Sequence, residues 1–137
     1  MDKIIGKRVF RIVGNVLSAN YMRVPPMALQ SLQLTGRYLY TQVRTIPERY
    51  FIIHLYVVRQ DESVLDISIT NLFKESKLVG NVLQYPCELS PKWTTLCIDL
   101  TQIVKETKKN SDFKCLKGIQ VFFIVLFAVV LFLIVFI

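Results

Sequence analysis

The chain has 137 residues, of which 53% are hydrophobic, 20% are charged and 12% are aromatic. This length predicts one domain, and the composition excludes an intrinsically disordered chain, a collagen-like chain and, with only 3 cysteines, a dense disulfide scaffold. The 17 lysines and arginines outnumber the 10 acidic residues and give a net charge of +7, which favours an acidic partner.

The first elements expected along the chain are short strands. Residues 8–13 (RVFRIV) are rich in apolar side chains and end at Gly14, as a strand does before a turn. Basic and polar residues interrupt the apolar pieces of this N-terminal region, so we expect no signal peptide and a cytosolic chain. Residues 37–44 and 50–59 are two further strands, and the short connection between them predicts an antiparallel pair.

Alternating side chains define the strands that follow. Residues 60–63 (QDES) predict a turn, and residues 64–70 carry an apolar side chain at every second position, which is typical of a half-buried strand. Residues 93–100 predict another strand, and residues 113–120 begin one more.

One short helix is expected between the last two strands, over residues 101–108. Leu100, Ile103 and Val104 follow helical spacing, and Asp99 stands three residues before Gln102, as in a capping box. These elements predict a mainly β fold over residues 1–120: an antiparallel β-sandwich or jelly-roll-like domain with one short helix.

Residues 121–137 are seventeen consecutive apolar residues without a charge. As a helix this segment would be ~26 Å long, close to the ~30 Å hydrocarbon core of a bilayer. We therefore predict a second region, a C-terminal hydrophobic transmembrane helix, with the preceding lysines keeping the basic domain in the cytosol. The predicted membrane-spanning residues are Val121, Phe122, Phe123, Ile124, Val125, Leu126, Phe127, Ala128, Val129, Val130, Leu131, Phe132, Leu133, Ile134, Val135, Phe136 and Ile137.

Two alternatives for this hydrophobic segment stay open. It has the composition expected from translation of a U-rich non-coding stretch, because Phe, Leu, Ile and Val share a middle-U codon, so it is also explained by a truncated gene model. A pair of buried strands is the other alternative, but seventeen unbroken apolar residues exceed the usual length of one strand.

Catalytic motifs are absent from the sequence. No glycine-rich phosphate-binding motif occurs, and His54 is the only histidine. A general base needs a nucleophile and usually an orienting acid, and the neighbours of His54 in the sequence supply neither. We predict a structural histidine, no enzyme activity and no small-molecule substrate.

Other chemically interesting side chains are also better explained as structural. We expect Asp66 and Asp99 to be solvated surface charges. The widely spaced Cys87, Cys97 and Cys115 form no CxxC pair, so we expect reduced, mostly buried thiols and neither a metal nor a cofactor. We also expect the turn residues Asp61 and Glu62 to be solvated surface charges, and we expect Trp93 to be part of the core.

A basic cluster is the main candidate for binding. Over residues 105–117 five lysines face only two acidic residues, and we predict that this cluster binds an acidic partner. A merely solvated basic face is the alternative, and nucleic-acid binding should be weak because no recognition motif or interleaved aromatic residues accompany the lysines. The candidate residues are Lys105, Lys108, Lys109, Lys114 and Lys117.

Five tracts, in order and at matching spacing, resemble the cilia- and flagella-associated protein 20 domain family. They are residues 17–25 (LSANYMRVP), 30–40 (QSLQLTGRYLY), 51–57 (FIIHLYV), 71–75 (NLFKE) and 93–100 (WTTLCIDL). The family has further sequence before and after the matching part, so the chain resembles a partial domain.

This resemblance implies a non-enzymatic β-sandwich module of centrioles, basal bodies and ciliary axonemes. It implies tubulin in the microtubule wall, together with other ciliary or centriolar proteins, as partners. The alternative function, from the hydrophobic segment, is a tail-anchored membrane protein with a basic cytosolic interaction domain.

Overall fold

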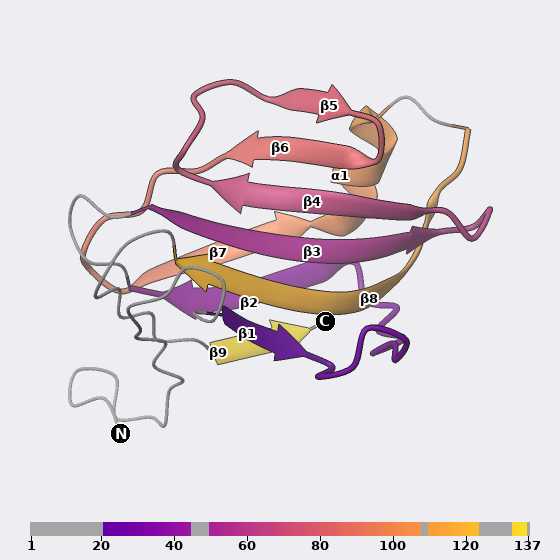
Figure 1. Ribbon diagram of the computed structural model, residues 1–137, viewed down its shortest axis with the longest axis horizontal. Coiled ribbons are helices and arrows are strands. Elements are labelled where there is room, and N and C mark those ends of the chain that lie inside the picture. The colour runs from indigo at the N-terminus through magenta and orange to yellow at the C-terminus, as the bar shows by residue number, and fades with distance from the viewer. Residues whose placement is uncertain (1–20, 45–49, 108–109, 124–132, 137) are drawn as a thin grey trace.

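Two β-sheets face each other across one apolar core (Figure 1). The computed structural model describes residues 21–44, 50–107, 110–123 and 133–136. Within them the larger sheet has six strands in the order β1-β8-β3-β4-β6-β5, and the smaller has three in the order β7-β2-β9. The strands are β1 (Tyr21–Val24), β2 (Tyr38–Val43), β3 (Phe51–Arg59), β4 (Val64–Thr70), β5 (Lys77–Val79), β6 (Val82–Pro86), β7 (Thr94–Asp99), β8 (Phe113–Phe123) and β9 (Leu133–Phe136), and the helix is α1 (Leu100–Glu106).

The long central strand β3 shows why these residues form a sandwich. Its side chains alternate strictly between buried and half-buried, and the buried set includes Phe51, Ile53, Leu55 and Val57. Opposite sides of a strand face opposite sides of its sheet, so one face of β3 lies in the core and the other faces outward. The predicted mainly β fold with one short helix is confirmed.

The predicted pairing of residues 37–44 with 50–59 is wrong. In the described residues, β2 pairs with β7 and β9, whereas β3 pairs with β4 and β8 in the other sheet. The chain therefore crosses from one layer to the other between these strands. Both strands have a face in the same core, and an apolar pattern shows that a strand is buried without showing which strand lies beside it.

The predicted strand over residues 64–70 and the capped helix are confirmed. Asp99 is the N-cap of α1, and its carboxylate accepts a hydrogen bond from the backbone N–H of Gln102 at 3.1 Å. The helix ends at Glu106, two residues before the predicted end. A wholly antiparallel arrangement is wrong, because β4 and β6 run parallel, with β5 returning antiparallel along the outer side of β6.

The hydrophobic C-terminal segment is extended where the structure describes it. Val121 is fully buried in β8, between Met22 of β1 and Ile53 of β3, and Leu133–Phe136 forms β9 beside β2. The predicted transmembrane helix is therefore wrong for these parts of residues 121–137, and the boundary predicted after residue 120 falls inside β8. β-branched residues suit a central strand, and the segment supplies pieces of two strands in place of one long element. No helix within the described residues has the length and apolar character needed to cross a membrane.

Candidate functional site: a basic trough beside β8

The strand β8 departs from regular pairing at Lys117. Tyr56 of β3 lies opposite Gly118. The next residue of β3, Val57, lies opposite Leu116, so Lys117 has no opposing residue on β3. Such an extra residue is a β-bulge, which bends the strand and redirects a side chain. Leu116 stays fully buried, while the Lys117 side chain is half-buried.

A second irregularity in the same strand falls at Lys114. Val58 of β3 lies opposite Cys115, and Arg59 lies opposite Phe113, so Lys114 also has no opposing residue. The Lys114 side chain is 43% exposed. Both lysines of β8 thus occupy positions that the β3 ladder skips, which presents two ammonium groups outside the core.

Residues 31–35 run beside this part of β8 and form the other side of the site. The Leu32 N–H donates to the Lys117 carbonyl at 2.9 Å, and Leu34 exchanges backbone hydrogen bonds with Leu116. Leu32 and Leu34 are half-buried, whereas the polar residues that alternate with them, Ser31, Gln33 and Thr35, are exposed. This alternation leaves the hydroxyl and amide groups of the segment on its exposed side, where they line the same site as the two lysines.

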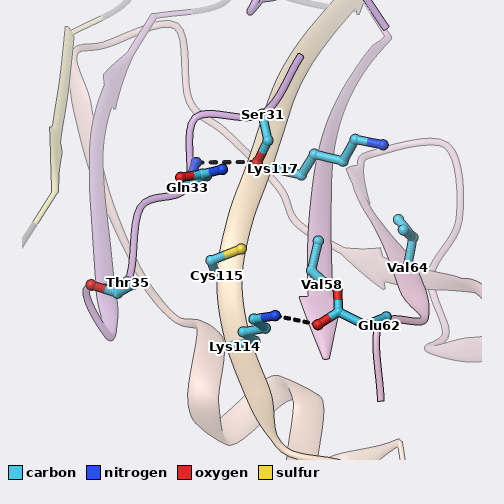
Figure 2. A pocket seen from close by; sticks show the side chains of 9 residues that line it. All are labelled: Ser31, Gln33, Thr35, Val58, Glu62, Val64, Lys114, Cys115 and Lys117. Carbon is cyan, nitrogen blue, oxygen red and sulfur yellow. Dashed lines mark hydrogen bonds and ion pairs between the residues drawn. The ribbon is translucent and has the colours of Figure 1, made fainter. Parts of the chain in front are cut away.

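A trough of about 570 Å³ lies between these walls (Figure 2). Polar side chains of residues 31–35 lie along one side of β8, Cys115 lies on the strand itself, and the β3–β4 turn lies on the other side. The lining residues are Ser31, Gln33, Thr35, Val58, Glu62, Val64, Lys114, Cys115 and Lys117. Two ammonium groups beside hydroxyl and amide donors suit a ligand that carries carboxylates.

One lysine of the trough is already paired. The Lys114 ammonium donates to the Glu62 carboxylate, and this hydrogen bond is the main reason that the pKa of Lys114 is raised above its ordinary value. Among the described residues Lys117 has no ion-pair partner. Within the described part of the chain, the trough therefore holds one paired lysine, Lys114, and one lysine without an ion-pair partner, Lys117.

The structure brings together two of the five predicted lysines. Lys114 and Lys117 line the trough, whereas Lys105 is exposed in the last turn of α1 and does not line it. Lys108 and Lys109 lie outside the described residues. The lysine-rich segment was detected in the sequence, but its partner residues 31–35 and Glu62 were not, because no sequence pattern links them to β8.

His54 has polar partners that its sequence neighbours did not reveal, although it is not arranged for catalysis. Its Nδ1 lies 2.9 Å from Oδ1 of Asp66 and 3.1 Å from Oγ of Ser68, both on the neighbouring strand β4. A nucleophile–base–acid relay needs the hydroxyl and the carboxylate on different ring nitrogens, but here both approach the same one. The ring stacks on Tyr56 with 5.9 Å between centroids and meets Phe122 edge-on, so this cluster anchors the outer face of the sheet.

Asp99 is not a free surface charge either. Besides capping α1, its carboxylate accepts two-pronged hydrogen bonds from the Arg37 guanidinium, at 3.0 Å from Nε and 2.7 Å from Nη2. This pairing is the main cause of the lowered pKa of Asp99. Asp66 and Asp99 lie in different sheets and form no carboxylate pair.

Residues 1–128 match the family model of the CFA20 domain. The chain belongs to the CFA20 domain family, which confirms the resemblance found in the sequence. It is 40% identical over 123 residues to centriole proteome protein 16 of Chlamydomonas reinhardtii, covering 88% of this chain and 6% of that protein. It is 39% identical over 118 residues to human WD repeat-containing protein 90, covering 75% of this chain and 7% of the relative. The corresponding Xenopus tropicalis protein is 42% identical over 86 residues, covering 63% of this chain and 5% of the relative. The chain thus spans a small part of these relatives.

The described part of this CFA20 domain offers no cluster of three or more residues able to hold a metal ion. Its three cysteines are free: Cys115 is buried, Cys87 is half-buried and Cys97 is exposed, so the expected burial holds for only part of the set. Burial raises the pKa of the Cys87 thiol. Trp93 is half-buried and lies immediately before β7, so it is only partly in the core.

Proposed function

We propose that this CFA20 domain is a non-enzymatic structural module of centrioles, basal bodies or ciliary axonemes that associates with the microtubule wall. The relative from Chlamydomonas is named for the centriole proteome, and family membership extends over residues 1–128. These matches support a centriolar or ciliary role for this chain.

The basic trough is the single structural observation that carries the proposal of microtubule binding. It presents Lys114 and Lys117 from bulged positions, on a chain of net charge +7. Tubulin has an acidic surface, and a cationic patch attracts an acidic partner and orients its approach. In this proposal other ciliary or centriolar proteins contact the remaining surfaces of the sandwich.

Co-sedimentation with taxol-stabilised microtubules tests this function. All 137 residues should be used, because β8 extends past residue 120 and β9 pairs with β2. We expect the chain to pellet with microtubules at moderate salt, and the affinity of the double variant Lys114→Gln/Lys117→Gln to fall about tenfold, since two charge-assisted contacts are lost.

The matched control is Lys74→Gln/Lys77→Gln, which removes the same charge from exposed positions before and in β5. This control should bind like the parent chain. Failure of the parent chain to pellet would contradict the proposed function. Equal losses of microtubule affinity in the two double variants would show that the trough is not the binding site.

A further inference from the structure

We propose that the Glu62 carboxylate is an internal substitute for a carboxylate of the partner, so that an extended acidic peptide binds in the trough by displacing Glu62 from Lys114. This inference deepens the proposed function, on which it rests, by naming the chemical class of the ligand. It also assigns Glu62 a regulatory role, because this side chain sets the fraction of molecules in which Lys114 is available to a ligand.

The backbone of the β3–β4 turn places Glu62 in an unusual conformation. The Glu62 N–H donates to the Arg59 carbonyl at 3.0 Å, and the Arg59 N–H donates to the Ser63 carbonyl at 2.9 Å. This pattern is a three-residue hairpin loop, whose last position requires a left-handed backbone and usually carries glycine. Here Glu62 takes that position with φ 67°. Residue 62 is thus a glutamate at a position where the left-handed backbone favours glycine, and its carboxylate accepts a hydrogen bond from Lys114.

The turn itself is held independently of this ion pair. The Ser63 N–H and hydroxyl both donate to Oδ1 of Asp61, and the Asp61 N–H donates to Oγ of Ser111 at 3.0 Å. The Gln60 N–H donates to the Asp112 carbonyl at 2.9 Å. None of these contacts involves the Glu62 side chain, which is 69% exposed. The carboxylate can therefore leave Lys114 by rotation of its side chain, with the loop backbone unchanged.

The trough has space and donors for more than one carboxylate. Its volume of about 570 Å³ exceeds that of a single side chain, and Lys117 lies in it as a second cation. An incoming peptide would place one carboxylate on Lys114, where Glu62 is now, and another on Lys117. Ser31 and Thr35 supply hydroxyl groups along the opposite wall.

The lining chemistry favours an acidic peptide over nucleic acid. Single-stranded nucleic acid is usually held by aromatic side chains that stack on bases, and phosphate is often held by the two-pronged donors of arginine. The residues that line the trough include neither an aromatic residue nor an arginine. Among the described residues that line the trough, Glu62 carries the only carboxylate, and its pairing with Lys114 shows that the site accommodates this chemistry.

Displacement predicts that removing the internal carboxylate tightens binding. A ligand that binds only the open form has an apparent affinity reduced by the fraction of open sites. If Glu62 occupies Lys114 for most of the time, the variant Glu62→Gln should bind an acidic peptide about threefold to tenfold more tightly. Lys114→Gln should weaken binding, because it removes the cation for which both carboxylates compete.

Fluorescence anisotropy with a fluorescein-labelled decaglutamate peptide tests the inference on all 137 residues. The matched control is Glu75→Gln, which makes the same charge change at an exposed residue outside the trough. We expect a clear gain in affinity for Glu62→Gln, less than about twofold change for Glu75→Gln because it alters only the overall field, and a loss for Lys114→Gln.

Equal gains in the two glutamate variants would overturn the inference, since they would show a general effect of net charge. No measurable binding of decaglutamate, or tighter binding of a labelled oligouridine with the same response to Glu62→Gln, would overturn it as well. The outcome is separable from the proposed function. Peptide binding that responds to Glu62 without microtubule pelleting would refute only that function, whereas microtubule pelleting that depends on Lys114 and Lys117, without a response of peptide binding to Glu62→Gln, would refute only the displacement.

Discussion

The two halves of β8 differ in a way that explains where the candidate site lies. Up to Gly118 the strand skips two positions of the β3 ladder, and each skipped residue is a lysine. From Ile119 to Phe122 every residue pairs in register with both β1 and β3. The regular half closes the core, and the interrupted half escapes the strict inward–outward alternation and can present cations to solvent.

The largest effect is expected from a charge in the regular half. Val121→Asp places a carboxylate at a fully buried position between two strands, which should destabilise the fold by more than about 4 kcal/mol and abolish cooperative unfolding. Lys114→Gln in the interrupted half should leave the urea midpoint almost unchanged. A stably folded Val121→Asp chain in the same denaturation experiment would contradict the central position of β8.

An intermediate effect is expected at Gly118, where the two halves meet. A Cβ atom there would lie 3.1 Å from the Val24 carbonyl oxygen and 3.4 Å from Cδ of Pro25. Gly118→Ala should therefore lower the free energy of unfolding by about 1–3 kcal/mol, since backbone atoms cannot easily move aside. Lys117→Ala is a suitable control because the adjacent Lys117 side chain is partly exposed. It should change the free energy of unfolding by at most about 0.5 kcal/mol. If Gly118→Ala left the free energy of unfolding unchanged, β1 would not approach β8 this closely.

A smaller effect separates backbone strain from charge at Glu62. Glu62→Gln and Glu62→Gly both remove the carboxylate, but only glycine relieves the left-handed backbone at φ 67°. The glycine variant should be the more stable of the two by roughly 1 kcal/mol in urea unfolding. Equal stabilities would indicate that the loop imposes no strain on residue 62.

The smallest effect is the pH dependence of the pair between Lys114 and Glu62. Because the folded chain raises the pKa of Lys114, the contribution of the pair is complete below the ordinary lysine pKa of about 10.4 and disappears as the pH rises through the raised value. The difference in urea midpoint between the parent chain and Glu62→Gln should thus stay constant from about pH 8 to about pH 10.4 and shrink as the pH rises further. A difference that persists at the higher pH would mean that Glu62 stabilises the loop without Lys114.

The longer strands β2, β3, β4, β7 and β8 could be predicted from the sequence, but the strands β1, β5, β6 and β9 and the neighbours of each strand could not. The alternation over residues 64–70 and the N-cap at Asp99 are local signals, and the structure confirms both elements. The edge strand Lys77–Val79 is too short to show a period. The apolar run after residue 120 satisfies the requirements of a membrane helix and of a central strand equally, because both environments exclude charge.

The candidate site was predictable only in part for the same reason. The density of lysines over residues 105–117 indicated a cationic surface, yet the bulges that expose Lys114 and Lys117 depend on the pairing of β8 with β3. Glu62 lies 52 residues from Lys114 in the sequence, and its contact arises only from the fold.

The place of β8 between β1 and β3 also has a consequence during synthesis on the ribosome. In the described residues β1 pairs with no other strand, so β1 can pair only after the segment translated about a hundred residues later has emerged. Until then the edges of β1 and β3 are unpaired and open to association with other nascent chains. The order of translation thus makes a chaperone's protection most valuable just before Phe123 emerges.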